Sequence, residues 1–375
     1  MEQLIQMLHS IPEYNTLLGG ISSGKSAAVT GIGQINRSHL IAGLCRDAKR
    51  PVVILCQDDI AARRLQEDLK DFLSETVPIL PGRELTLYDA SAVSRSWEQK
   101  RIGQLYALAH GETPVQIFTW ESLSLRTMPP QVLNAAAFTL EVGKEYPLDE
   151  LTERLTNAGY NRSPMVEGVG QFTVRGGIVD IYSPGAEAPI RAEFFGDELD
   201  TLAFFDTGTQ RREENLSSAR ILPVAETVPS LHSGGIAGLC GDLRNLIARQ
   251  NRRKNVNAPL VATLTKDLEK FENGLSSTAS DRYMALIYPE NATAADYVPR
   301  DALWVLCDHA ALQRTARTRT EEMGMTLDSS LQAGLVVGEL CDYCCQWEDF
   351  THGLTGRCTV YFDAFAGSQY PADNL

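Results

Sequence analysis

Short apolar runs alternate with amphipathic stretches over the first part of the chain. The runs are bounded by turn residues and predict buried strands at residues 27–31, 51–56 and 115–120. Between them, apolar residues recur at helical spacing over residues 38–48, 59–73 and 96–111. Strands that alternate with helices in this way predict an α/β fold with a parallel sheet.

The pattern changes between residues 136 and 223. A helical stretch at residues 148–160 precedes short strands at residues 171–176, 177–183, 190–196 and 202–206, which is typical of an α+β module. Helical spacing returns at residues 241–254 and 264–275, and apolar runs predict a strand pair at residues 282–289 and 302–308. We therefore expect one α/β domain, made of residues 1–135 and 224–375, that an inserted domain at residues 136–223 splits.

Charge and composition exclude several function classes. The formal charge of −14 over 375 residues argues against broad, nonspecific binding of nucleic acid. No apolar run approaches the ~18 residues of a membrane span, and the N-terminus lacks the features of a secretion signal. Cys56 and Cys307 lie inside apolar runs, as reduced core thiols do. No membrane contact and a cytoplasmic location are expected.

A phosphate-loop motif occurs at residues 19–26, which read GGISSGKS and include Lys25. Such a loop binds phosphate only between a strand and a helix, because the helix N-terminus supplies the backbone N–H groups. Here a helix-like stretch precedes the motif and a strand-like run follows it. We expect an ordinary helix-to-strand connection.

The strand-to-helix context occurs a few residues later, but the residues that hold phosphate have changed. Asn36 replaces a glycine, and Arg37 replaces the lysine whose compact ammonium contacts phosphate. The acidic companion motif has His309 after Asp308, where a carboxylate would activate water. We predict a degenerate loop and a degenerate acidic motif, no cofactor and no tight binding of ATP. The residues concerned are Gly31, Gly33, Asn36, Arg37, Ser38 and Asp308.

With these features, the chain resembles the N-terminal region of bacterial transcription-repair coupling factors (Mfd), most specifically over residues 148–160 and 165–223. The inserted module is the part most similar to UvrB. The resemblance implies a degenerate P-loop, helicase-like fold without enzyme activity, whose inserted domain binds UvrA. It also implies that RNA polymerase and DNA are bound by further domains, including an ATP-dependent translocase, that this chain lacks.

The alternative is a UvrB-like protein that binds ATP and recognises damaged DNA. That class requires an intact phosphate loop and a long aromatic-rich hairpin that clamps DNA. The loop here is degenerate, and the stretch between residues 85–91 and the helix at residues 96–111 leaves no room for such a hairpin. The sequence therefore favours the coupling-factor interpretation.

One face of the inserted sheet is the candidate binding surface. Because side chains alternate along a strand, Ile190, Ala192 and Phe194 face one side. By themselves the outward residues predict an ordinary solvated face, and the Gly176-Gly177 pair predicts a bulge or bend within a strand. The resemblance implies instead that the outward face contacts UvrA. The residues carried over are Arg175, Arg191, Glu193 and Phe195.

Two other clusters carry weaker signals. Cys341, Cys344, Cys345, His352 and Cys358 offer zinc-ligand types, but their spacing is loose, and we expect the first three to lie in a helix. The basic residues between 249 and 254 are expected to be the solvated end of a helix, where cations complement the helix dipole.

Overall fold

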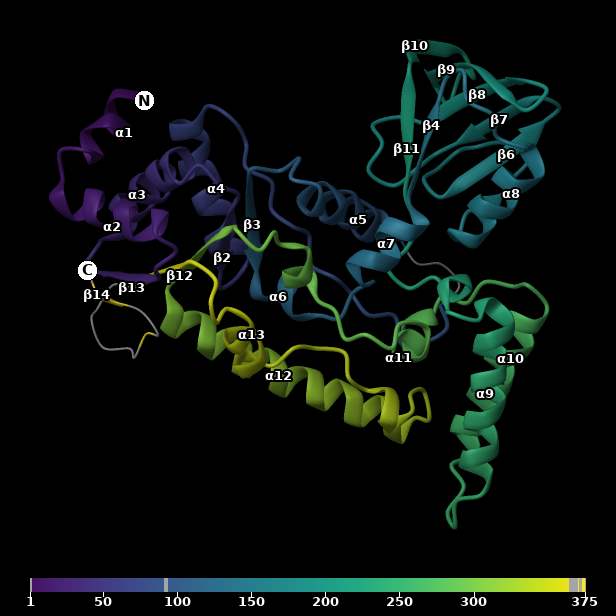
Figure 1. Ribbon diagram of the computed structural model, residues 1–375. Coiled ribbons are helices and arrows are strands. Elements are labelled where there is room, and N and C mark those ends of the chain that lie inside the picture. Colours follow the sequence, from purple (N-terminus) through teal and green to yellow (C-terminus); the bar gives the residue numbers. More distant parts are fainter. Residues whose placement is uncertain (1, 91–93, 364–369, 371–372, 375) are drawn as a thin grey trace.

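A computed structural model describes residues 2–90, 94–363, 370 and 373–374. Its larger sheet is parallel and has six strands in the order β14-β1-β13-β12-β2-β3 (Figure 1). These are β1 Ala27–Thr30, β2 Val52–Cys56, β3 Val115–Thr119, β12 Leu303–Cys307, β13 Thr359–Asp363 and β14 Asp373–Asn374. One sheet thus combines strands that precede and follow residues 138–221, so the predicted parallel sheet is confirmed.

Helices cover both faces of this sheet. Val53 and Leu55 of β2 belong to one apolar core, whereas Val52, Ile54 and Cys56 belong to the other, as expected for a strand buried on both faces. The core that contains Val52 is covered by α1 Glu2–Leu8, α2 Pro12–Ser22, α3 Gln34–Asp47 and α4 Asp59–Leu73. The helices of the core that contains Val53 include α5 Ser96–Ala109, α6 Trp120–Ser124, α7 Pro130–Ala136, α12 His309–Gln332 and α13 Trp347–Gly353.

A second sheet lies in the segment between β3 and β12, at the upper right of Figure 1. Its order is β10-β9-β8-β7-β6-β5, with β5 Asn161–Arg162, β6 Gln171–Arg175, β7 Ile178–Ile181, β8 Ile190–Phe195, β9 Glu198–Phe205 and β10 Arg212–Leu216. One face packs on helix α8 Leu148–Asn157 and on an antiparallel ribbon of β4 Phe138–Glu141 and β11 Ser218–Ile221. The result is a separate apolar core.

Helix α5 is the platform on which this second sheet docks. The Cα atoms of Gly103 and Gly185 approach so closely that a Cβ on Gly103 would stand 3.0 Å from the Gly185 Cα. Arg220 donates to both oxygens of Glu112 at 2.6 and 3.0 Å and lies over the Tyr106 ring. A backbone contact at the β7–β8 connection and a two-bond ion pair from β11 therefore join this part of the chain to α5 and to the residues that follow it.

The remaining elements contain two corrections to the sequence prediction. Helices α9 Gly235–Asn251 and α10 Ala258–Glu272 form a hairpin. Most of the predicted strand at residues 282–289 is helical, with 3₁₀ residues Ser280–Tyr283 followed by α11 Met284–Ile287. The predicted strand was wrong because a short, fully buried apolar run has no period that separates strand from helix. Cys341, Cys344 and Cys345 lie between the 3₁₀ turn Gly338–Leu340 and α13, outside any helix. None of the helices described is long and apolar enough to cross a membrane.

Candidate partner-binding surface

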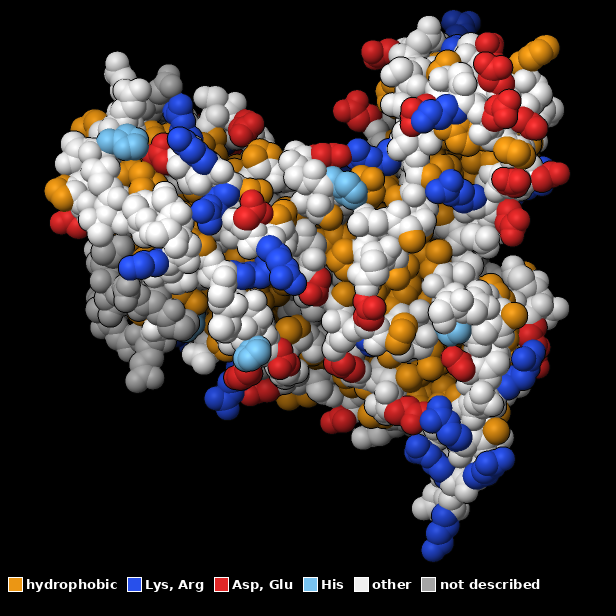
Figure 2. Space-filling view, in the orientation of Figure 1, with side chains coloured by type: hydrophobic (Ala, Val, Ile, Leu, Met, Phe, Trp, Pro, Cys, Tyr) orange, Lys and Arg blue, Asp and Glu red, His pale blue; other side chains and the backbone are white. Residues whose placement is uncertain are grey.

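The second sheet has one packed face and one polar face, as strand alternation predicts. Ile190 and Ala192 are buried in its core, and Phe194 packs against that core. Arg191 and Glu193 project from the opposite side, which we call the outer face. Figure 2 shows basic and acidic side chains interspersed over this part of the molecule, at the upper right. The outer face is the candidate surface, and its geometry follows.

Asp180 lies at the centre of the outer face and pairs with both predicted arginines. Arg191 donates from Nε and Nη2 to the two carboxylate oxygens at 2.7 and 2.9 Å, and Arg175 donates from Nη2 at 2.7 Å. The Asp180 side chain is 1% exposed, whereas Arg191 and Arg175 are 15% and 48% exposed. These hydrogen bonds raise the pKa of Arg191. Arg191 is therefore mostly buried in contacts within the domain, whereas the Arg175 side chain has more exposed surface that a partner could contact.

The sequence prediction missed Asp180. It stands opposite Arg191 in the β7–β8 register, and this pairing makes a cross-strand ion pair. The available signal was an acidic residue flanked by Val179 and Ile181, both buried on the other face. Strand alternation shows that Asp180 points outward, but the register that pairs it with Arg191 required the structure.

Glu193 continues the alternation of charge across the sheet. Its carboxylate lies 3.4 Å from Arg212 on β10 and accepts a hydrogen bond from the Thr201 hydroxyl at 3.1 Å. The Glu193 and Arg212 side chains are 39% and 33% exposed. Basic and acidic groups thus alternate from Arg175 to Arg212, so the outer face offers directional contacts of both signs.

Phe195 stands out because it is 85% exposed at the end of β8. The β8–β9 turn begins at Gly196, whose φ of +65° suits glycine in a two-residue hairpin. The Gly176-Gly177 pair forms the β6–β7 turn, because Arg175 pairs with Ile178, so the chain reverses at this pair, which lies between two strands and not inside one as predicted. Phe194 donates its N–H to the Gly177 carbonyl at 2.7 Å. Both turns therefore lie at the same end of the sheet, and Phe195 and Arg175 are both at that end.

The residues of the degenerate loop take up the expected strand-to-helix position. Gly31 has a φ of +77° between β1 and α3, and Gly33 caps the helix. Ser38 is buried, and its hydroxyl donates to the Asp68 carboxylate of α4 at 2.6 Å. Asn36 is exposed and Arg37 is half-buried. The hydroxyl that would face a bound metal in an intact loop is thus engaged within the protein.

Asp308 is engaged in a similar way. Its carboxylate accepts from the Ala311 N–H at 3.0 Å and caps α12, with a φ of +62°. Burial lowers the pKa of the adjacent His309.

The upstream motif at residues 19–26 has the helix-to-strand context that the sequence predicts. Helix α2 extends through Gly19 and Gly20, and exposed Lys25 lies in the connection to β1.

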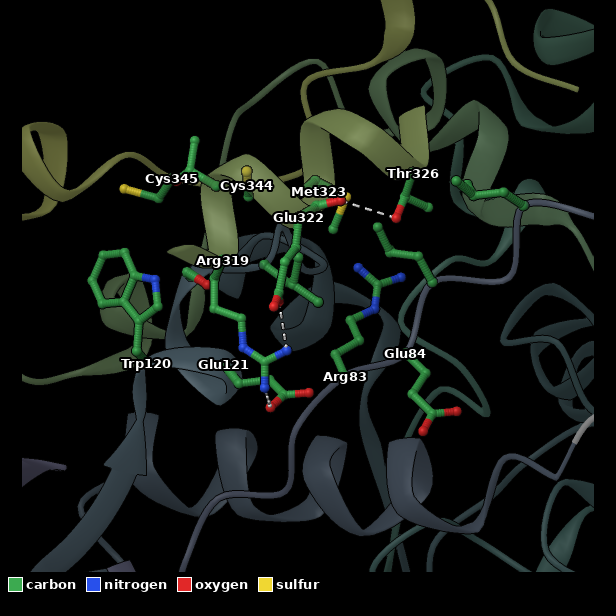
Figure 3. A pocket seen from close by; sticks show the side chains of 15 residues that line it. Arg83, Glu84, Trp120, Glu121, Arg319, Glu322, Met323, Thr326, Cys344 and Cys345 are labelled. Atoms are coloured by element: carbon green, nitrogen blue, oxygen red, sulfur yellow. Dashed lines mark hydrogen bonds and ion pairs between the residues drawn. The ribbon is translucent and has the colours of Figure 1, made fainter. Parts of the chain in front are cut away.

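A cleft with a volume of about 420 Å³ lies between α12 and the segment around α6 (Figure 3). Arg319 crosses it and pairs with Glu121 and Glu322, each at 3.0 Å. The lining includes none of the residues predicted for phosphate or partner binding. Among the described residues, no group of three or more His, Cys, Asp or Glu is arranged to hold a metal.

The segment that carries the outer face matches a known family. Residues 138–226 match the family described as the UvrB interaction domain. This segment is similar to UvrB interaction domains. It contains all four residues of the candidate surface, Arg175, Arg191, Glu193 and Phe195.

The whole chain is homologous to transcription-repair-coupling factors. It is 24% identical over 348 residues to the factor of Bacillus subtilis strain 168, which covers 91% of this chain and 29% of the relative. The factor of Staphylococcus aureus strain MRSA252 is 26% identical over 90% of this chain and 29% of its own length. The Myxococcus xanthus factor is 32% identical over 56% of this chain and 18% of its own length. The predicted resemblance is confirmed, and the chain spans less than a third of these relatives.

Proposed function

We propose that this chain recruits UvrA for transcription-coupled nucleotide excision repair, through the outer face of its UvrB interaction domain. The observation that supports this most is Phe195, an aromatic side chain that is 85% exposed at the same end of the sheet as Arg175, in the segment that matches this family. Exposed aromatic and arginine residues are enriched among the contacts that dominate protein interfaces. Glu193 and Arg212 add polar contacts of both signs around them.

We also propose that residues 1–135 and 224–375 form a degenerate P-loop, helicase-like domain without ATPase activity, interrupted by residues 136–223. Ser38 and Asp308 support this, because their side chains bond Asp68 and the Ala311 backbone. No cofactor and no catalytic residue are proposed. RNA polymerase binding and DNA translocation are proposed for parts of a longer cytoplasmic protein, because this chain spans 29% of the Bacillus subtilis relative.

Titration of UvrA with variants of the whole chain tests the proposal. Phe195→Ala is expected to weaken binding about tenfold or more, as truncation of an interface anchor does. Arg175→Ala is expected to weaken it by a smaller factor. Neither change should move the melting temperature, because Phe195 is exposed and Asp180 keeps Arg191 as a partner. Tyr88→Ala is the matched control, since Tyr88 is 61% exposed but lies in the other domain.

Equal binding of UvrA by the parent, Phe195→Ala and Arg175→Ala would show that the outer face is not the contact. Loss of binding in Tyr88→Ala as large as that in Phe195→Ala would place the contact elsewhere on the chain. A parent chain that does not bind UvrA at all would overturn the proposed function itself.

A further inference from the structure

The hairpin of α9 and α10 carries concentrated positive charge at its tip. The tip consists of residues 249–257, where α9 ends at Asn251 and α10 begins at Ala258. Figure 1 shows the hairpin projecting from the body, and Figure 2 shows basic side chains gathered on the projecting end. The charge thus stands away from the rest of an acidic chain.

These charges are largely not neutralised by the described part of the protein. Arg249 pairs with Glu339 at 3.1 Å. Arg252, Arg253 and Lys254 are exposed, and the described residues give them no ion pair. The helix dipole does not account for all three, because its effect falls off within the last turn and Arg253 and Lys254 lie beyond α9. Adjacent unpaired cations repel one another and do not stabilise the fold.

The side chains at the tip select one kind of partner. Every residue from Asn251 to Asn255 has side-chain N–H donors, and residues 249–257 include no aromatic residue. Protein interfaces depend on aromatic and apolar anchors, and single-stranded nucleic acids bind by stacking on aromatic rings. Only Val256 offers apolar surface here. Arginine, lysine and asparagine are, in contrast, the side chains that bond phosphate oxygens.

We propose that the tip of the α9–α10 hairpin is a contact site for the phosphate backbone of a nucleic-acid duplex. The contact is independent of sequence and weak, since the formal charge of −14 repels phosphates from the rest of the surface. It adds local attraction at one projecting point. The site is separate from UvrA recruitment, because the hairpin lies outside residues 138–226.

Fluorescence anisotropy of the whole chain with labelled DNA and RNA duplexes, in increasing salt, tests this site. The parent is expected to bind at low salt with a slope of log K against log salt of about −2 to −3, for about three phosphate contacts. The triple variant R252E/R253E/K254E should lose about tenfold or more of that affinity. It should melt like the parent, because all three side chains are exposed.

The matched control reverses three exposed arginines elsewhere, in the variant R63E/R64E/R314E. It changes the net charge equally and should lose less than about threefold, the effect of the long-range field alone. The two duplexes distinguish the source of the phosphates: loss with both supports the shared backbone, and loss with one alone supports that duplex. Equal losses by both triple variants, or a parent that does not bind at low salt, would refute the site. Displacement by polyglutamate as effective as by unlabelled duplex would point instead to an acidic protein.

Discussion

The ion pairs of Asp180 affect how the results of substituting Arg191 and Arg175 are interpreted. Strand alternation places Arg191 on the outer face and, taken alone, predicts that its replacement leaves stability unchanged. The structure leads us to expect a loss of stability instead, because Arg191 makes two hydrogen bonds to a carboxylate that is 1% exposed. Arg191 also lies over the buried Phe205 ring and donates to the Gln210 carbonyl. Loss of binding in an Arg191 variant can therefore arise from unfolding.

We predict that Arg191→Ala lowers the free energy of unfolding by about 3 kcal/mol, since it removes the main partner of a buried charge. Arg175→Ala should cost less than about 1 kcal/mol, because Arg175 is half exposed and Asp180 keeps Arg191. Urea unfolding of both variants beside the parent measures the difference. Equal costs would mean that the two arginines share Asp180 evenly and would contradict this assignment.

At the scale of elements, the sequence predicts those helices and strands that have a clear local hydrophobic pattern. Continuous apolar runs such as residues 51–56 correctly give β1, β2, β3 and β12 of the parallel sheet, but β13 was not predicted. The same reasoning fails at residues 282–289, where Tyr283 and Met284 are also fully buried but helical. Contacts between distant elements have no local signal. The approach of Gly103 to Gly185 requires knowing that the second sheet rests on α5.

We predict that Gly103→Leu lowers the free energy of unfolding by about 1 to 3 kcal/mol, because the new side chain overlaps the Gly185 backbone. Gly241→Leu is the matched control. Gly241 also lies inside a helix, but a Cβ there would meet nothing within 4 Å, so leucine should stabilise by up to about 1 kcal/mol. Chemical denaturation gives both values, and faster hydrogen exchange at residues 220–224 in Gly103→Leu would locate the defect. Equal effects of the two substitutions would show that the contact does not constrain the docking.

For the whole molecule, the sequence indicates the sheet and predicts the loss of its phosphate site. Asn36, Arg37 and His309 are visible departures from a working motif. Further structural reasons are not visible in the sequence. The Ser38 hydroxyl is engaged by Asp68, which is 30 residues away, and only the packing of α3 on α4 reveals that pair.

We predict that the whole chain neither binds Mg-ATP at micromolar concentration nor hydrolyses it. Isothermal titration calorimetry checks the binding, and a phosphate-release assay checks the hydrolysis. Lys25→Ala and Arg37→Ala serve as diagnostic variants. Binding that Lys25→Ala abolishes would restore the upstream motif as a nucleotide site, and binding that only Arg37→Ala abolishes would show that the degenerate loop still holds a ligand.

The pairing of β4 with β11 also determines how easily the unit that contains the second sheet can be moved into another protein. Phe138 and Ile221 are register partners, so the chain enters and leaves this unit at points about 5 Å apart. A unit with neighbouring ends can be excised and the gap closed with a short peptide, without stretching the host. For the same reason, it can be transplanted into a surface turn of an unrelated carrier, and its outer face would travel with it.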